Sequence, residues 1–555
     1  MVSMRSQVAA CASILLFVMN VPSLFAADAA PALTGSVSSA EEGVMEGVLI
    51  SAKKAGSPLT ITVVSDAQGR YRFPAAKLDP GQYRISIRAI GYDLDGRVNA
   101  EVVAQKTASA DLKLRKTTDL AAQMTNAEWL SSMPGEQKMK NTLLGCVGCH
   151  SLERIVRSKY DADGFLATVQ RMSTYANQST PLNPQKRLTT RATELVGEDR
   201  VRVQRAQADF LASVNLSQSA TWDYALKTFP RPKGKATQVV YTEYDLPRPT
   251  IEPHDVVLDP EGNAWYSNFG GQTLGKIDPK TGKHSEFPVP ELKKGSPVGA
   301  LSLRNDRDGN LWLGMMYQGG VAKFDRKSEK FQTWPIPAEM NSANTQVNMT
   351  SPMNIAVDGK VWSQNNGFAG IHRIDLKTGK WETWEPFKAS PQGHNIYDVV
   401  ADSKNNAYFT DIGREHVGRI DAKTGEITLF ATPTKDSGPR RAMMDDQDRL
   451  WFGEYRANAI AVFDTKSTEF KEWKLPMPWA APYDVAVDKN GHAWTGSMLN
   501  DRISRLDPKT GQFTEYLLPK QTNVRRVYVD NTTTPVTFWV GSNHGASIVK
   551  LEPLE

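Results

Sequence analysis

The C-terminal part of this chain contains an internal repeat whose period strongly limits the folds that the chain can adopt. A short segment, Asp-x-Lys followed by Thr or Ser, occurs six times at intervals of 47, 50, 46, 43 and 43 residues. The six copies begin at Asp278, Asp325, Asp375, Asp421, Asp464 and Asp507. A single multi-stranded unit of this size cannot bury both of its faces without neighbours. A repeat of this length is therefore typical of a β-propeller.

Each repeat unit has one large aromatic residue at an equivalent position, so the units can be counted. These residues are Trp265, Trp312, Trp362, Tyr408, Trp451, Trp494 and Trp539. The last unit stops before an outer strand, whereas an additional strand-like segment, 239–244, precedes the first unit. We predict a seven-bladed, all-β propeller over 236–555, in which segment 239–244 completes the last blade and closes the ring.

Aligning the units predicts two rings of residues that converge on the propeller axis as a funnel. The first ring leads into the innermost strands and contains His254, Val298, Met353, Tyr397, Arg440, Tyr483 and Arg525. The second ring follows each aromatic by three residues and contains Asn268, Met315, Asn365, Asp411, Glu454, Ser497 and Ser542. Such a funnel can bind a small polar or anionic ligand. The alternative is a funnel of solvated side chains that binds nothing.

The repeat units resemble the streptogramin (virginiamycin B) lyase family of seven-bladed propellers over residues 240–553. The similar motifs are EPHDVV, which begins at Glu252, and LWFGE, which ends at Glu454. The resemblance implies that Glu252 and His254 match two positions of a magnesium-dependent site that opens a cyclic depsipeptide by elimination. Asn268 and Arg525 stand where the family has a glutamate and a histidine. Neither side chain accepts a proton at neutral pH, so the magnesium site and the reaction lack two of their groups. His254 is the candidate catalytic residue that remains.

Residues 32–116 alternate apolar and polar positions in short runs separated by turn residues. This pattern predicts a small antiparallel β-sandwich. The string SDAQGRYRF, which begins at Ser65, and the later PGQY and AIGY resemble the carboxypeptidase regulatory-like family. The resemblance implies a transthyretin-like module without catalytic residues. We therefore expect a spacer or docking role for this domain.

The pentapeptide CVGCH at residues 146–150 is the most specific chemical motif of the chain. Covalent haem attachment requires two thiols three positions apart and a following histidine that binds the iron. A CxxC pair alone would also fit a redox disulfide or half of a zinc site. The only other cysteine is Cys11, so a second pair that could complete a zinc site is missing. We expect one covalent haem c on Cys146 and Cys149, with His150 as the proximal iron ligand.

The segment 118–222 around this motif has the apolar spacing of α-helices, with Asp161 placed to cap one of them. With its CxxCH motif, the segment resembles a small α-helical, single-haem class I cytochrome c domain. The resemblance implies a methionine as the distal iron ligand. Met172 is the only methionine between His150 and the propeller. The alternative is that Met172 packs in the core of its helix.

Residues 1–26 contain Arg5, an apolar run from Val8 to Phe25 and a small residue at Ala26, as in a secretory signal peptide. Haem is attached after export in bacteria, so the signal and the haem motif together predict a periplasmic protein. No later apolar run reaches the roughly 20 residues of a membrane span. We thus expect no transmembrane segment in the mature chain. The net charge of +5 is spread among acidic residues and does not indicate a nucleic-acid surface.

Two functions from different classes fit these features. In the first, the chain is a periplasmic electron-transfer protein or a haem-bearing oxidoreductase component. Its propeller then binds a substrate or a redox partner, which is an electron donor or acceptor protein. In the second, a lyase or hydrolase acts in the funnel, and the haem domain is a sensor or a tether. Covalent haem is expected in an electron-transfer chain and is hard to explain in a simple lyase, so we favour the first.

Overall fold

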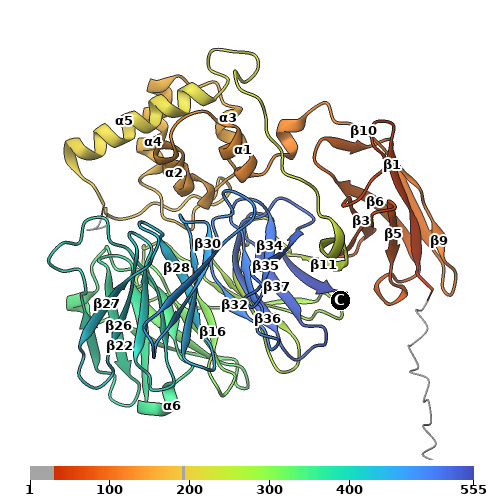
Figure 1. Cartoon of the computed structure of the whole chain (residues 1–555). Helices are drawn as coiled ribbons and strands as arrows, with labels where there is room; N and C mark the ends of the chain where they lie inside the picture. Colours follow the sequence, from red (N-terminus) through yellow and green to blue (C-terminus); the bar gives the residue numbers. More distant parts are fainter. Residues whose placement is uncertain (1–29, 191–193, 555) are drawn as a thin grey trace, which may run out of the picture.

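The computed structural model describes residues 30–190 and 194–554. The predicted signal peptide and Cys11 lie outside the described residues. The chain forms an N-terminal β-sheet domain, a small helical region and a larger set of antiparallel sheets. The helical region lies on one end of the propeller, and the N-terminal domain lies beside the propeller (Figure 1). Within the described residues, none of the helices is both long enough and apolar enough to span a membrane.

The N-terminal domain consists of two sheets that enclose an apolar core, as the alternating pattern predicts. Its strands are β1 (Leu33–Ser39), β2 (Gly43–Val44), β3 (Leu49–Lys54), β4 (Leu59–Val64), β5 (Arg70–Phe73), β6 (Gly81–Arg88), β7 (Tyr92–Leu94), β8 (Val98–Val102), β9 (Ala108–Ser109) and β10 (Leu112–Lys116). One sheet has the order β2-β1-β10-β7, and β5 and β9 also pair with β1. The pairs of β1 with β9 and β10 are parallel. The sandwich is therefore mixed and not purely antiparallel, because the chain returns from β8 to run alongside β1 in the same direction.

The repeat forms a propeller of six separate four-stranded antiparallel sheets and a seventh blade that is part of a larger sheet. Blade 1 consists of β12 (Pro253–Leu258), β13 (Ala264–Asn268), β14 (Thr273–Ile277) and β15 (His284–Pro288). Blade 2 consists of β16 (Leu303–Asn305), β17 (Leu311–Gly314), β18 (Gly320–Asp325) and β19 (Lys330–Pro335). Blade 3 consists of β20 (Val347–Ser351), β21 (Lys360–Asn365), β22 (Gly370–Asp375) and β23 (Trp381–Trp384). Blade 4 consists of β24 (Ile396–Ala401), β25 (Ala407–Asp411), β26 (His416–Ile420) and β27 (Ile427–Ala431). Blade 5 consists of β28 (Pro439–Met444), β29 (Arg449–Glu454), β30 (Ala459–Asp464) and β31 (Phe470–Lys474). Blade 6 consists of β32 (Ala486–Val487), β33 (Ala493–Gly496), β34 (Arg502–Asp507) and β35 (Gln512–Leu517). Blade 7 consists of β36 (Val524–Asp530), β37 (Thr537–Ser542) and β38 (Ser547–Pro553), together with β11 (Val239–Asp245).

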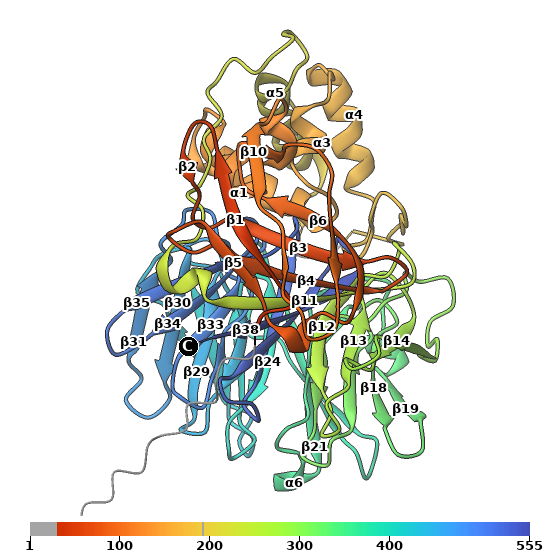
Figure 2. The same cartoon turned by 90° about the vertical axis from the view of Figure 1, so that its right-hand side faces the viewer.

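The ring closes as the sequence predicts, because β11 pairs antiparallel with β38 and completes blade 7. The opposite edge of β11 pairs with β4 of the N-terminal domain, so that Tyr241 lies between Leu551 and Thr62. One eight-stranded sheet therefore runs through both domains, and β11 is visible at their junction in Figure 2. An exposed strand edge is a site of unwanted pairing. The N-terminal domain covers this one.

The repeated residues stabilise turns within each blade. In the Asp-x-Lys-Thr segment of blade 4, Asp421 Oδ1 accepts hydrogen bonds from the backbone nitrogens of Lys423 and Thr424, both at 3.0 Å. In four blades the aromatic residue acts at a second turn, as where Trp265 Nε1 donates to Asp259 Oδ2 at 2.8 Å. Such carboxylate caps favour tight turns. Residues that mark the repeat in the sequence are therefore residues that stabilise turns in the fold.

The helical region consists of short helices, as its apolar spacing predicts. They are η2 (Leu120–Gln123), α1 (Asn126–Ser132), α2 (Gln137–Thr142), η3 (Leu143–Gly148), α3 (Glu153–Val156), α4 (Ala162–Met172) and α5 (Gly197–Val214). Asp161 caps α4 by accepting a hydrogen bond from the backbone nitrogen of Gly164 at 2.8 Å. One buried cluster joins Trp129 and Val147 of this region to Phe269 and Met498 of the propeller. The helical region and the propeller thus share a core.

Candidate functional site

The two cysteines of the CxxCH motif lie at the end of η3 as free, partly buried thiols. Burial raises the pKa of Cys146 to about 12 and that of Cys149 to about 11. A redox-active CxxC pair instead contains a thiol of lowered pKa that attacks disulfides as the thiolate. The environment of this pair therefore does not match a disulfide oxidoreductase.

His150 follows the pair, and its ring is held by a backbone contact. Its Nδ1 lies 3.0 Å from the carbonyl oxygen of Ser151. In the tautomer that donates this hydrogen bond, Nε2 has a free lone pair that can bind a metal. Burial also lowers the pKa of His150, which favours the neutral imidazole that metals require. These features fit an axial haem ligand.

Three side chains of blade 7 hold the backbone of the motif against the propeller. Asn523 Nδ2 donates to the carbonyl oxygen of Val147 at 3.1 Å. The carbonyl oxygen of Gly148 accepts from Arg525 Nη2 at 2.9 Å and contacts His544 Nε2 at 3.2 Å. Burial, assisted by the charge of Arg525, lowers the pKa of His544 to about 4, so His544 is neutral. The CxxCH motif therefore packs against blade 7 of the propeller.

The predicted rings contain Arg525 but not Asn523 or His544. Both flank ring positions, since Asn523 precedes Arg525 by two residues and His544 follows Ser542 by two. Their spacing was therefore visible in the sequence. Their function was not, because it depends on contact with residues almost 400 positions away.

Four residues of the first predicted ring meet at the axis of the propeller. His254 Nε2 lies 3.0 Å from the hydroxyl of Tyr483, which also bonds to the hydroxyl of Tyr397. Arg440 Nη2 donates to Tyr397 at 3.2 Å, and its guanidinium lies 4.2 Å from the ring centroid of Tyr483. The aromatic rings thus hold the arginine by cation–π contacts. The result is a continuous buried polar network on the axis.

Two residues of the first ring were aligned wrongly. Met353 is 49% exposed and lies beyond the end of β20, because the short helix α6 (Ile355–Asp358) lengthens the connection to β21. The position equivalent to His254 in this blade is Asn348, since Val347 pairs with the second-ring residue. In blade 2 the equivalent position is Leu301 and not Val298, as the hydrogen bond from the Leu301 nitrogen to Gly314 shows.

Glu252 is buried beside the motif, and Asn268 supports its backbone. Neither carboxylate oxygen of Glu252 has a well-formed hydrogen bond. Burial raises its pKa to about 8, while Arg525 and Asn543 act in the opposite direction. The charges of Glu252 and Arg525 both act on the pKa of Cys149, so these groups lie close together. Asn268 Oδ1 accepts a hydrogen bond from the backbone nitrogen of Glu252 at 3.2 Å. Asn268 is thus a structural residue here.

His254, the candidate base, is fully enclosed. Its Nδ1 lies 2.9 Å from Asp255 Oδ1, and its Nε2 is bonded to Tyr483. Burial lowers its pKa to about 3, against the opposing effect of Asp255. Both ring nitrogens therefore have protein partners. In this arrangement His254 does not face a ligand as a general base would.

The remaining predicted residues lie apart from this network. Met172 is the last residue of α4 and is 42% exposed, so it is not packed in a core. Its role as distal ligand stays a prediction. Glu454 is buried in blade 5, and burial together with Glu472 raises its pKa to about 8. Asp411 is buried in blade 4 and bonds to His394.

Buried ion pairs join blades that are not neighbours in the ring, and these pairs were not predicted. Arg441 of blade 5 bonds to both oxygens of Asp255 in blade 1. Arg304 of blade 2 bonds to Asp398 of blade 4, with its Nη2 2.7 Å from Oδ2. A buried pair is expensive to break, because the remaining charge has no partner. These pairs therefore fix the positions of blades 1 and 5, and of blades 2 and 4, relative to each other.

Comparisons with known proteins agree with two of the three predicted resemblances. Residues 294–553 match the model of the Virginiamycin B lyase family, and residues 32–115 match that of the Carboxypeptidase regulatory-like domain. Neither matched segment includes the helical region. Among solved structures, virginiamycin B lyase from Staphylococcus aureus is 24% identical and has a TM-score of 0.48; it covers 56% of this chain and 99% of its own. A streptogramin B lyase is 20% identical, with a TM-score of 0.48, over 58% of this chain and 99% of its own. No curated protein matches the chain.

Proposed function

We propose that this chain is an exported c-type haem protein that transfers electrons in the periplasm, as an oxidoreductase component. The observation that carries the proposal is the CxxCH motif with free thiols and a neutral His150 whose Nδ1 is bonded to Ser151. In this proposal Cys146 and Cys149 would hold the haem through thioether bonds, and His150 would bind the iron through Nε2. When bound, haem supplies a one-electron couple between ferric and ferrous iron.

The chain's own residues then orient the motif and control its surroundings. Arg525 and Asn523 hold the carbonyl oxygens of the motif and keep it fixed against the propeller. Glu252 holds a proton near neutral pH beside Cys149, because its pKa is raised to about 8. Arg525 thus supplies a positive charge next to the motif, and Glu252 supplies an uncharged carboxyl group. We propose that the propeller serves this site by binding a substrate or a donor or acceptor protein.

A haem stain after denaturing electrophoresis tests the proposal, using the full chain expressed in cells with functional haem-attachment machinery. We expect a stained band for the wild type and no stain for the double variant Cys146→Ser, Cys149→Ser. Visible spectra of the purified protein should change reversibly between oxidised and reduced states. A colourless wild-type band would overturn the proposal.

A second candidate function is a lyase that acts in the propeller. The match of residues 294–553 to the Virginiamycin B lyase family favours it. Against it stand the enclosed His254 and the amide of Asn268, which has a structural role. In addition, Gln185 in the connection between α4 and α5 donates to the carbonyl oxygens of Gly270 and Val298. The helical region therefore contacts the loops of blades 1 and 2.

Incubation with magnesium and a cyclic streptogramin antibiotic separates the two candidates. We expect no linear product, because neither Asn268 nor Arg525 can accept a proton and His254 is enclosed. The matched control is the His254→Ala variant. Metal-dependent turnover that this variant abolishes would establish the lyase function instead.

A further inference from the structure

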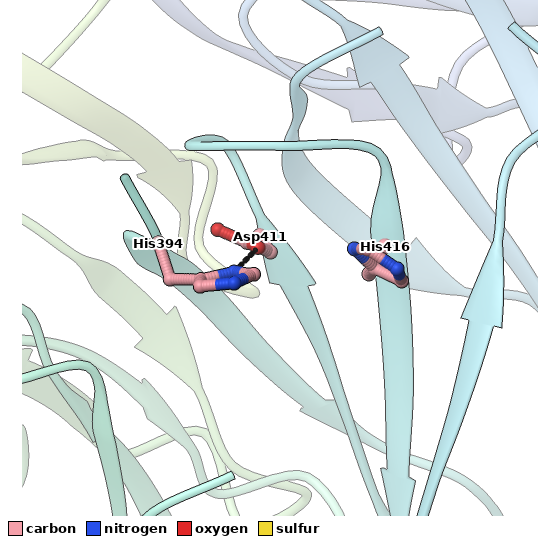
Figure 3. Close-up of side chains that lie close together, drawn as sticks. All are labelled: His394, Asp411 and His416. Atoms are coloured by element: carbon pink, nitrogen blue, oxygen red, sulfur yellow. Dashed lines mark hydrogen bonds and ion pairs between the residues drawn. The ribbon is translucent and has the colours of Figure 1, made fainter. Parts of the chain in front are cut away.

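Three potential metal ligands meet in blade 4, away from the motif and the axial network. They are His394, Asp411 and His416, and one donor atom from each lies within 4.8 Å of the others. No other group of three such side chains occurs in residues 30–190 and 194–554. Figure 3 shows His394 bonded to Asp411, with His416 presented by the neighbouring strand toward the same space.

The strands of blade 4 bring these residues together. Asp411 is the last residue of β25 and His416 the first of β26, and the two are direct cross-strand partners. Asp411 also pairs with Ile396, the first residue of β24, which His394 precedes by two positions. Directly opposed residues on neighbouring strands have their side chains close together. The blade therefore positions the three ligands on one end of its inner strands.

The cluster is held in place before any ion binds. Asp411 Oδ1 accepts hydrogen bonds from the backbone nitrogens of Asn395 at 2.7 Å and Gly413 at 3.0 Å. These bonds leave Oδ2 to face His394 Nδ1 at 2.6 Å. The ring of His394 stacks on Phe387, with centroids 3.8 Å apart and an interplanar angle of 6°. Such outer contacts orient metal ligands in known sites.

A nearby cation, Arg456, forms hydrogen bonds with backbone oxygens and not with the three potential ligands. Arg456 donates to the carbonyl oxygens of Ile412, Arg414 and Asp436. These bonds fix the turn that connects Asp411 to His416. The charge of Asp411 acts on the pKa of Arg456, so the two side chains interact electrostatically. Its hydrogen bonds, however, all go to backbone oxygens.

His416 provides independent evidence for a ligand. Its Nδ1 is buried and has no hydrogen-bond partner in the described residues. A buried polar atom without a partner is rare in folded proteins and requires an explanation, such as an ion. The side chain of His394 is 16% exposed, which leaves a route for an ion to reach the cluster.

We propose that His394, Asp411 and His416 bind a divalent transition metal ion of the zinc or ferrous iron type. Two imidazoles and one carboxylate suit these ions, whereas magnesium and calcium prefer oxygen ligands throughout. Metal bonds of about 2.0–2.2 Å place ligand atoms roughly 3–3.5 Å apart, so only small side-chain movements are needed. The site does not depend on haem or on the lyase positions, which lie on other elements.

Equilibrium dialysis of the purified full chain against Zn²⁺, followed by metal analysis, tests this proposal. We expect one zinc ion per chain from this site and an upward shift of the thermal midpoint, because an ion that binds only the folded state stabilises it. His394→Ala and His416→Ala should weaken this binding by more than about 100-fold. Asp411→Asn should weaken it as well, since the amide can keep its backbone bonds through Oδ1 but lacks the charge.

His492→Ala is the matched control. His492 Nδ1 also lies near a carboxylate, 3.3 Å from Asp488 Oδ2, but belongs to no group of three. It should retain the zinc ion. The proposal fails if the wild type binds no zinc, or if the cluster variants bind zinc as tightly as the wild type. Zinc held elsewhere, for example by Cys146 and Cys149, would give this second result.

Discussion

Arg525 and Gly148 are 377 residues apart in the sequence, and Arg525 Nη2 donates to the carbonyl oxygen of Gly148 at 2.9 Å. This contact joins blade 7 to the CxxCH motif. Arg525 is 4% exposed and lies over the ring of Phe269, at 5.5 Å from its centroid. Arg525, which was predicted to line an open funnel, is thus buried and holds the CxxCH motif against the propeller.

Asn523→Ala should loosen the motif from the propeller. The amide of Asn523 donates to Val147 and to Met498, and both carbonyl oxygens lose a donor in the variant. Leaving such groups buried without a partner costs about 1–3 kcal/mol. We expect faster hydrogen exchange of the backbone amides in 143–152. The exposed Asn490→Ala is the control, and equal exchange in both variants would contradict the role of Asn523.

Met172→Ala should lower the reduction potential of the haem-loaded protein and remove the spectral signature of a sixth ligand. Thioether ligation favours ferrous iron, so its loss favours the ferric form. Redox titration of the full chain measures this. Met353→Ala is the control, because Met353 is also an exposed methionine. A wild-type potential in Met172→Ala would rule out Met172 as the distal ligand.

Glu454 should make the protein less stable as the pH rises through neutrality. Burial raises its folded-state pKa to about 8, compared with 4.5 for an ordinary glutamate. Between these values the folded protein holds a proton that the unfolded chain has lost. Its contribution to stability is complete below pH 4.5 and falls by up to about 1.4 kcal/mol per pH unit above it.

Glu454→Gln should remove this part of the pH dependence, since glutamine does not titrate. Thermal unfolding of both proteins from pH 5 to 9 measures the difference. The stability gain of the variant over the wild type should grow with pH. A constant difference across this range would show that Glu454 is charged when folded.

Arg88→Ala should destabilise the contact between the N-terminal domain and blade 6. Arg88 Nη2 lies 2.6 Å from Asp501 Oδ2, and the Asp501 side chain is 4% exposed. Its loss leaves a buried carboxylate without its partner, at a cost of about 3 kcal/mol. Arg84→Ala on the same strand is the control, because Arg84 is exposed. Denaturant unfolding should show a clear loss for the first variant and a change within about 0.5 kcal/mol for the second.

Patterns that repeat over short distances were predicted well. The spacing of the aspartates and aromatics led to the propeller, and segment 239–244 led to its closure through β11. The first ring failed only at Val298 and Met353. In blade 2 no difference in length explains the error, because Leu301 precedes Trp312 by 11 residues, as His254 precedes Trp265. In blade 3 the cause is the short helix α6, which an alignment on the aromatic residue does not detect.

The sequence by itself determined the order of the sheet, helical and repeat segments, the helical periodicity and the CxxCH motif as a candidate site, because each depends on residues close together in the chain. Only the tertiary structure decided which distant side chains and strands contact each other. It enclosed His254 between Asp255 and Tyr483, and it brought His394 and His416 to Asp411. It also joined β11 to β4 in one sheet. Each of these contacts is set by strand register and domain packing, which depend on burial across the whole fold and leave no local signal in the chain.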